Sequence, residues 1–441
     1  MNGPAAPLKF HVTNSRVFAI AGPAMLANLT TPLLGLVATA AIGRLGEAHL
    51  LGGVALAAIV FDGIYWLFGF LRMGTVALTA QALGAGDVKE QRAVLSRALV
   101  IAGIIGVGLI ALQAPLVHAT SELLGGSAAV RQAAETYFFV RIWSAPFTLG
   151  NLSLVGWLVG TARAGIALAL QIAINSFNIA LTVLLVIWLD FGIRGAALAA
   201  LLAEAAGFAV GLAVAWRLLG RRFETSAAIV LERDKLLRML AVNRDIMIRT
   251  ACVIGAFAFF TSQGARAGDL ALAANAVLQN FVMIGSFFLD GMATAAEQVC
   301  GRSVGARDRP GFVRATKLAL AWGLGFGLAS TAVFLAGGTA LIDVMTTSAE
   351  VRRVAREFMA FAAAAPVLGA LAYTLDGVFI GATWARDMRN LMLVAFAIYL
   401  ATWWALTPYG NAGLWVAILV FLAARGLLQA ARYPALLRQT F

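Results

Sequence analysis

The sequence predicts an all-α integral membrane protein, with twelve transmembrane helices in two six-helix lobes related by a parallel internal repeat. Three observations lead to this prediction. Hydrophobic residues make up 61% of the 441 residues and charged residues only 12%, and the mean hydropathy is +0.88. The apolar residues gather in runs of roughly 20, the length that crosses a hydrocarbon core. The two halves of the chain also match each other in sequence.

The composition excludes the other broad classes. A soluble chain of this length cannot hide so much apolar surface from water. A disordered chain needs low hydrophobicity and high charge, which is the opposite of what is found. The strands of a transmembrane barrel alternate polar and apolar residues, whereas the apolar runs here are nearly unbroken.

The apolar runs predict six spans in each half of the chain. No small-residue cleavage site precedes Ala19, so we interpret the first run as a retained span rather than a signal peptide. The runs of the first half are 16–40, 50–78, 92–115, 132–156, 165–189 and 195–217. Those of the second half are 245–265, 270–299, 315–340, 357–380, 389–407 and 412–432.

Basic residues give the expected orientation. With the N-terminus in the cytosol, the inner segments hold roughly three times as many Lys and Arg residues as the outer ones, and we assign only Arg72 to the interior of a span. We therefore expect a multi-pass protein of the bacterial inner (plasma) membrane with both termini cytosolic. The formal charge of +12 then reflects orientation, because no basic stripe carries the interleaved aromatic residues of a nucleic-acid site.

The longest polar stretch, 217–249, divides the chain near its midpoint. It mixes charges of both signs and spaces Leu236, Leu237 and Leu240 as one amphipathic helix does, which favours an interfacial helix over a disordered linker. The expected organisation is an N-terminal lobe, a cytosolic linker with an amphipathic helix, and a C-terminal lobe. Their ranges are 1–218, 219–243 and 244–441.

Glycine, proline and aspartate positions reveal the repeat. Six spans separate equivalent points, so the halves have the same orientation, as in transporters that alternate access between two lobes. The Gly-Ala-x-Asp turns also suit helix ends, where glycine permits a tight turn and aspartate caps the next helix. The matches, at offsets of 218 to 221, are Gly84–Asp87 with Gly305–Asp308, Pro146 with Pro366, Gly160 with Gly381, and Gly195 with Gly413.

Motifs along nearly the whole chain resemble the DinF-like branch of the MATE (multidrug and toxic compound extrusion) transporters. They are PLLGLVATAAIGRLG (32–46), LGG (51–53), FLRMGTVALTAQALGAGD (70–87), NRDIMIRT (243–250), ARAGDLALAANAVLQNF (265–281), FFLDGMATAAEQVCGRSVGARDR (287–309) and LDGVFIGATWARDMRN (375–390). The resemblance implies two six-helix lobes around a central cleft. It also implies export of bulky, mostly cationic or amphipathic organic compounds by alternating access, driven by inward flow of H⁺ or Na⁺.

The sequence departs from the family pattern at two acidic positions. Family members usually carry an acid in the first helix, in a pattern such as PLLGLVDTAVIG, where this chain has Ala38. Many also carry an acid four residues after the asparagine of a fifth-helix NIxLD pattern, where NIALT gives Asn178 and then Thr182. The familiar proton site of the N-terminal lobe therefore lacks both carboxylates.

Ionisable residues inside spans are candidates for coupling, because an unpaired charge at bilayer depth is costly. Asp290 and Glu297 are seven residues apart, which returns them to nearly the same helix face. Asp376 lies in the tenth span, where the family often places a cation-binding acid. Asp62 could replace the missing acids or attract a cationic substrate. The alternatives are structural: hydrogen bonds between helices, an Asp376–Arg386 pair and an Asp62–Arg72 pair.

Polar and aromatic residues within the spans form a second layer of candidates that could line the cleft. Hydrogen bonding between helices explains such residues equally well. The set is Asn28, Thr39, Tyr65, Trp66, Asn151, Asn175, Asn178, Thr182, Glu204, Asn275 and Gln279.

No enzymatic interpretation competes, because the sequence has no Walker P-loop and no HExxH motif. Cys252 and Cys300 lack the spacing of metal ligands. We expect no catalytic or metal site and no cofactor besides the coupling ion, with small organic substrates and lipids as partners of a monomer, and no nucleic acid. The alternative function is a flippase for lipid-linked oligosaccharides from the related superfamily. A flippase needs a strongly cationic cleft, and the sequence assigns more acids than bases to the spans.

Overall fold

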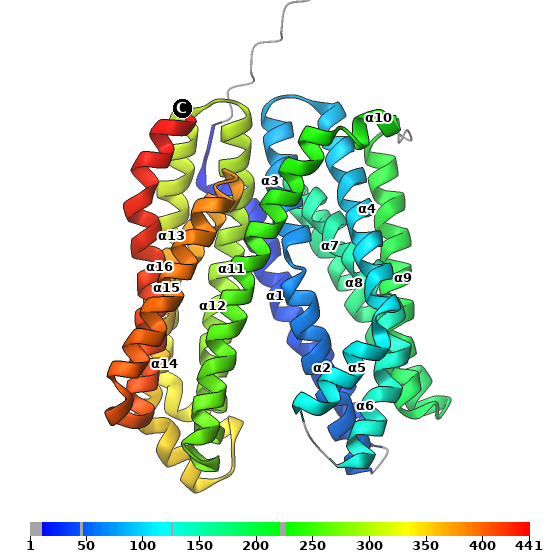
Figure 1. The fold of residues 1–441 in the computed structure, drawn as a ribbon, viewed down its shortest axis with the longest axis vertical. Coiled ribbons are helices and arrows are strands. Elements are labelled where there is room, and N and C mark those ends of the chain that lie inside the picture. The colour runs from blue at the N-terminus through cyan, green and yellow to red at the C-terminus, as the bar shows by residue number, and fades with distance from the viewer. Residues whose placement is uncertain (1–10, 45–46, 125–126, 221–225) are drawn as a thin grey trace, which may run out of the picture. The chain divides into compact units, whose positions relative to one another are not determined.

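The computed structural model describes residues 11–44, 47–124, 127–220 and 226–441, and the described residues form helices without any strand (Figure 1). Eleven helical segments among them are long and apolar enough to cross a membrane. The first helix, α1, is not among these eleven segments and is 30 residues long. The all-α membrane fold predicted from the apolar runs is confirmed.

The helices follow the predicted spans closely. The first half contains α1 (Asn14–Gly43), α2 (Ala48–Leu67), α3 (Phe70–Gly84), α4 (Val88–Ala111), α5 (Gln113–Leu124), α6 (Ala128–Arg141), α7 (Ala145–Gly160), α8 (Ala164–Thr182) and α9 (Gly192–Leu218). The second half contains α10 (Ala227–Val230), α11 (Arg233–Arg266), α12 (Asp269–Gly305), α13 (Arg309–Met345), α14 (Ala349–Gly381), α15 (Ala385–Ala405) and α16 (Gly410–Thr440).

Local sequence explains where several helices begin and break. The predicted span 132–156 is divided into α6 and α7 by a short 3₁₀ turn, and Pro146 stands in the first turn of α7, where a missing N–H costs nothing. The side chains of Asp87 and Asp308 cap α4 and α13, each accepting a backbone N–H at 2.9 Å. These caps confirm the role predicted for the aspartates of the repeated turns.

The polar stretch near the midpoint does not form a separate amphipathic helix in the described residues. Residues 221–225 lie outside the described part of the chain. Beyond them, Leu236, Leu237 and Leu240 occupy the first turns of α11, which continues without a break to Arg266. The interfacial character expected of the linker therefore belongs to the start of a transmembrane helix.

The chain divides into two compact units. The C-terminal unit comprises the described residues up to Met25, Ala80–Gly86 and Ala241–Phe441. The N-terminal unit comprises Leu26–Thr79 and Asp87–Leu240. Three helices, α1, α3 and α11, pass from one unit into the other.

The internal repeat is visible in the glycine contacts within each unit. A Cβ atom on Gly156 would overlap the backbone oxygen of Arg72, and one on Gly377 would overlap that of Ala293. The two contacts are related by the offset of 221 that the sequence shows. The pair Gly160 and Gly381 repeats the pattern one turn further along, against Val76 and Glu297. The repeated glycines therefore mark positions where helix backbones touch.

Candidate functional site

The clearest site is a buried charge cluster in the C-terminal unit, centred on Asp376 of α14. One carboxylate oxygen of Asp376 accepts hydrogen bonds from Arg249 of α11 and, at 2.6 Å, from Arg425 of α16. The other oxygen accepts from Gln429 at 2.6 Å. Asp376 is 3% exposed, Arg249 8% and Arg425 2%. We refer to these four residues as the Asp376 cluster.

Helix geometry explains how the cluster forms. Arg425 and Gln429 are four residues apart, so they point from the same face of α16 towards one carboxylate. The guanidinium of Arg425 also lies 5.6 Å from the ring centre of Tyr373, one turn before Asp376 on α14. Arg386, the partner considered from the sequence, is exposed on α15. The basic partners of Asp376 are therefore Arg249 and Arg425.

Asp290 of α12 lies beside this cluster. It is half-buried and interacts electrostatically with Arg249 and with Tyr373. Glu297, seven residues further along α12, is buried at the level of Gly381, where its backbone contacts α14. Arg249 thus pairs directly with Asp376 and interacts electrostatically with Asp290, and Glu297 lies closer to the end of α12.

The N-terminal unit holds a second group of ionisable residues, around Arg141 of α6. Arg141 interacts electrostatically with Asp62 and Glu204 and lies 5.2 Å from the ring centre of Phe61. The Tyr65 hydroxyl is 3.2 Å from that of Ser144.

Two members of the N-terminal group differ sharply in their surroundings. Glu204 accepts a hydrogen bond from the side-chain amide of Asn151 at 2.7 Å. Asp62 is exposed on α2, as is Trp66, which is 50% exposed. Asp62 and Trp66 are therefore available to a ligand, whereas the carboxylate of Glu204 is held by the amide of Asn151.

The remaining polar candidates mostly hydrogen-bond within their unit. Asn175 of α8 donates to Thr30 of α1 at 3.0 Å. Thr182 donates to Asn178, one turn earlier on α8, at 3.1 Å. Asn28 is half-buried and Thr39 is exposed, both on α1.

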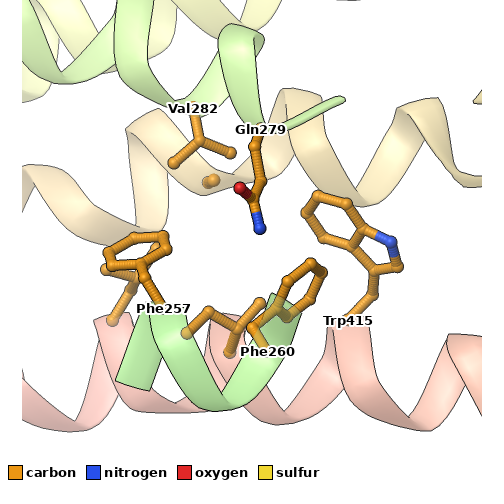
Figure 2. Close-up of a pocket in the computed structure, with 8 residues that line it drawn as sticks. Phe257, Phe260, Gln279, Val282 and Trp415 are labelled. Atoms are coloured by element: carbon orange, nitrogen blue, oxygen red, sulfur yellow. The ribbon is translucent and has the colours of Figure 1, made fainter. Parts of the chain in front are cut away.

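In the C-terminal unit, Asn275 of α12 exchanges hydrogen bonds with Asn411 of α16 and accepts one from Trp415. Gln279, one turn further, faces a small apolar pocket between α11, α12, α14 and α16 (Figure 2). Its amide donates to Thr261 of α11 at 3.3 Å. Asn275 thus joins helices, and Gln279 is the polar group of the pocket.

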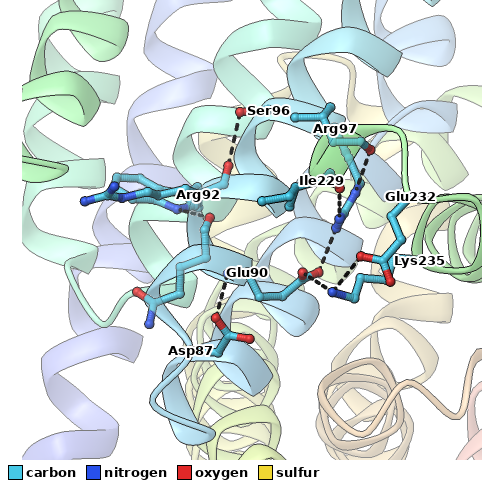
Figure 3. Close-up of polar contacts among 11 residues, drawn as sticks. Asp87, Glu90, Arg92, Ser96, Arg97, Ile229, Glu232 and Lys235 are labelled. Atoms are coloured by element: carbon cyan, nitrogen blue, oxygen red, sulfur yellow. Dashed lines mark hydrogen bonds and ion pairs between the residues drawn. The ribbon is translucent and has the colours of Figure 1, made fainter. Parts of the chain in front are cut away.

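The linker is held to α4 of the N-terminal unit by Arg97, which is 2% exposed (Figure 3). Its guanidinium donates to the backbone oxygens of Ile229 at 2.7 Å and Val230 at 3.0 Å, and to Glu90 at 2.7 Å. Glu90 also pairs with Lys235 of α11 at 3.1 Å. These contacts fix α10 and the first turn of α11 to α4.

Sequence reasoning missed three arginines. We assigned Arg141, Arg249 and Arg425 to connecting segments, although each falls inside a predicted span range: 132–156, 245–265 and 412–432. In the structure all three lie beside acids or aromatic rings within their units. The prediction that acids greatly outnumber bases inside the spans was therefore wrong. The sequence could have shown this, because the three arginines fall within the predicted span ranges.

The described residues contain no group of three or more His, Cys, Asp or Glu side chains arranged to hold a metal ion. The ionisable groups instead form ion pairs and hydrogen bonds between helices. Such an arrangement can bind and release a proton, or attract a charged ligand, without a cofactor.

The chain is similar to known proteins over most of its length. The MatE family profile matches residues 23–184 and 245–403. DNA damage-inducible protein F of Escherichia coli is 37% identical over 420 residues, covering 95% of this chain and 92% of that protein. A probable multidrug resistance protein NorM of Caulobacter vibrioides is 27% identical, covering 94% and 90%. The crystal structure of MATE in complex with MaD3S superposes with a TM-score of 0.85 at 21% identity, covering 96% of each chain.

Proposed function

The chain belongs to the MATE family of multidrug and toxic-compound efflux transporters, and from this premise we propose that it exports amphipathic, mostly cationic organic compounds by alternating access, driven by inward flow of H⁺, with Na⁺ as the alternative ion. Members of this family are transport proteins rather than enzymes. The flippase considered from the sequence is not favoured, because the family match extends over both halves of the chain.

Ionisable groups inside segments that can span a membrane are the observation that supports ion coupling. Asp290 lies at the centre of this argument, because it is half-buried beside Arg249 while Ala38 and Thr182 stand where the family usually has acids. In this proposal Asp290, Glu297 and Asp376 carry coupling, and Asp62 and the polar residues of both units contribute to binding. The protein acts as a monomer with no cofactor besides the coupling ion.

Dye efflux from everted membrane vesicles tests the proposal, with a pH gradient and a sodium gradient imposed separately. We expect the pH gradient alone to drive dye movement. Movement with the sodium gradient alone would identify Na⁺ as the coupling ion. Movement with neither gradient would contradict secondary active transport.

The proposed orientation places both termini and the linker in the cytosol of a bacterial cell, with the protein in the inner membrane. A cysteine introduced near either end, or at residues 228–235, should react with an impermeant maleimide only in everted vesicles. A cysteine at residue 347, between α13 and α14, should react only in intact cells. Labelling of the linker from outside would contradict the twelve-span topology.

Substrate charge can be tested at Asp62. The proposed preference for cations rests on the exposed carboxylate of Asp62 and the neighbouring ring of Trp66, which together suit a lipophilic cation. Asp62→Asn should weaken binding of a cationic dye roughly tenfold and barely change binding of a neutral analogue of equal size. Fluorescence titration of the purified protein measures both, and equal losses would assign Asp62 a structural role.

A further inference from the structure

Glu204 of α9 and Asn151 of α7 form a polar contact between two helices of the N-terminal unit. The side-chain amide of Asn151 donates to the carboxylate oxygen Oε2 of Glu204 at 2.7 Å and to the backbone oxygen of the same residue at 3.0 Å. Asn151 is 5% exposed, and Glu204 is half-buried. A neutral amide therefore holds a carboxyl group inside a segment that is long and apolar enough to cross a membrane.

Two glycines let α7 and α9 approach each other around this pair. A Cβ atom on Gly150 would overlap the ring of Phe208. A Cβ atom on Gly207, one turn after Glu204, would lie 3.5 Å from the side-chain nitrogen of Asn151. The close approach of the two helices keeps the amide within hydrogen-bonding distance of the carboxyl group.

The internal repeat does not reproduce the pair. At the offsets of 220 on α7 and 218 on α9, Leu371 takes the place of Asn151 and Leu422 that of Glu204. Apolar residues are therefore sufficient for the equivalent packing in the C-terminal half, and the acid and the amide are specific to the N-terminal half. Because an ionisable group inside a span is costly, its presence there points to a function.

One atom of the pair lacks a partner while Glu204 is ionised. The side-chain oxygen Oδ1 of Asn151 is buried and accepts no hydrogen bond from the described residues. An ionised carboxylate cannot supply one, because it only accepts hydrogen bonds. A protonated carboxyl group also carries an O–H donor, so it can donate to Oδ1 while its other oxygen accepts from the amide nitrogen. Protonation of Glu204 would therefore give a buried acceptor the partner that it needs.

The charged and titratable groups near the pair come from α2 and α6. Arg141 of α6 and Tyr65 of α2 interact electrostatically with Glu204. Arg141 also interacts with Asp62 of α2 and with Tyr137, one turn earlier on α6. The other two helices packed against this part of α9, α7 and α8, contain no acidic or basic residue. A proton bound at Glu204 therefore enters a group with one guanidinium and one further carboxylate.

We propose that Glu204 binds and releases a proton in the N-terminal unit, and that Asn151 is the positioning residue that holds its carboxyl group in both protonation states. This inference rests on the proposed function and adds a proton site to the coupling assigned to the C-terminal unit. The carboxylate takes a proton from the aqueous phase on Oε1, and the new O–H donates to Oδ1 of Asn151. Glu204 thereby supplies an acid to the unit in which Ala38 and Thr182 stand where the family usually has acids.

Infrared difference spectroscopy of the purified protein tests proton binding without any transport measurement. Spectra at mildly acidic and at alkaline pH are subtracted, because a protonated carboxyl group has a C=O stretching band that a carboxylate lacks. Glu204→Gln should remove one such band and should remain folded, since its amide can exchange hydrogen bonds with Asn151. Glu357→Gln is the matched control at an exposed acid paired with Arg353, and it should keep that band. A full set of bands in Glu204→Gln would overturn the proposal.

Asn151→Leu tests the positioning role separately. Leucine is the residue that the second half of the chain carries at this position, and it offers neither a donor nor an acceptor. The band of Glu204 should remain and move to higher wavenumber, because hydrogen bonding weakens a C=O bond. Asn178→Leu removes a hydrogen bond with Thr182 on α8 and should leave the band where it is. A band that does not move in Asn151→Leu would overturn the role of Asn151.

Efflux from everted vesicles connects the proton site to transport. Glu204→Gln should lose most of the efflux driven by a pH gradient, because its amide cannot take up a proton, whereas Glu357→Gln should lose none. Unchanged efflux by Glu204→Gln would overturn the coupling role. If the wild type shows no gradient-driven efflux, the proposed function fails, and the infrared bands still decide whether Glu204 carries a proton.

Discussion

Asp290→Asn is expected to abolish dye efflux driven by a pH gradient while leaving the amount of protein in the membrane unchanged. Asparagine has nearly the shape of aspartate but cannot take up a proton, so a coupling step at Asp290 is lost. The variant should still fold, because Arg249, Arg425 and Gln429 keep their hydrogen bonds to Asp376. The measurement is efflux from everted vesicles, normalised to folded protein by size-exclusion chromatography.

Two further variants make this result specific. Asp343→Asn removes an acid whose pairs with Arg352 and Arg356 are largely exposed, and it should leave efflux unchanged. Asp376→Asn should instead reduce the amount of folded protein, because it leaves two buried guanidiniums without their carboxylate. Normal efflux by both Asp290→Asn and the folded fraction of Asp376→Asn would contradict coupling at these two carboxylates, and Asp62 would become the leading candidate.

Gly305→Ala should cause a large loss of folded protein. Gly305 ends α12 against α3, and a Cβ atom there would overlap the backbone oxygen of Gln81. The equivalent glycine of the repeat, Gly84, meets the backbone oxygen of Arg302 in the same way. Because both neighbours are helix backbone, the added methyl group forces the helices apart. Overpacking of this kind costs about 1–3 kcal/mol, occasionally more.

Gly325→Ala is the matched control on α13, where a Cβ atom meets nothing within 4 Å. Alanine is preferred over glycine in a helix by roughly 0.5–1 kcal/mol, so this variant should be slightly more stable than the wild type. Unfolding midpoints in detergent compare the two substitutions directly. Equal midpoints for both variants would contradict the close contact of α3 and α12.

Much of the fold could be predicted because its determinants are local in sequence. Apolar runs long enough to cross a membrane gave helix positions within a few residues, as for the run 195–217 and α9. Asp87 and Asp308 cap the helices that directly follow them. The repeat could also be recognised from single positions, because a neighbouring helix backbone packs closely against Gly160 in one unit and against Gly381 in the other.

The candidate site was only partly predictable. The sequence marked Asp290 and Asp376, because an acid within an apolar run is conspicuous. It did not mark Arg249 or Arg425, because both lie near the basic ends of their runs and were counted as loop charges.

The sequence by itself therefore determined the class of the protein, the approximate positions of its apolar helices and the duplication of its halves, because hydropathy, caps and repeats act along the chain. Tertiary structure alone decided which charges meet. Arg249 and Asp376 are 127 residues apart, and Arg425 and Asp376 are 49 apart, so their pairing depends on which faces of α11, α14 and α16 are turned towards one another. That orientation is set by helix packing, through contacts such as those of Gly377 and Gly381, and no short stretch of sequence encodes it.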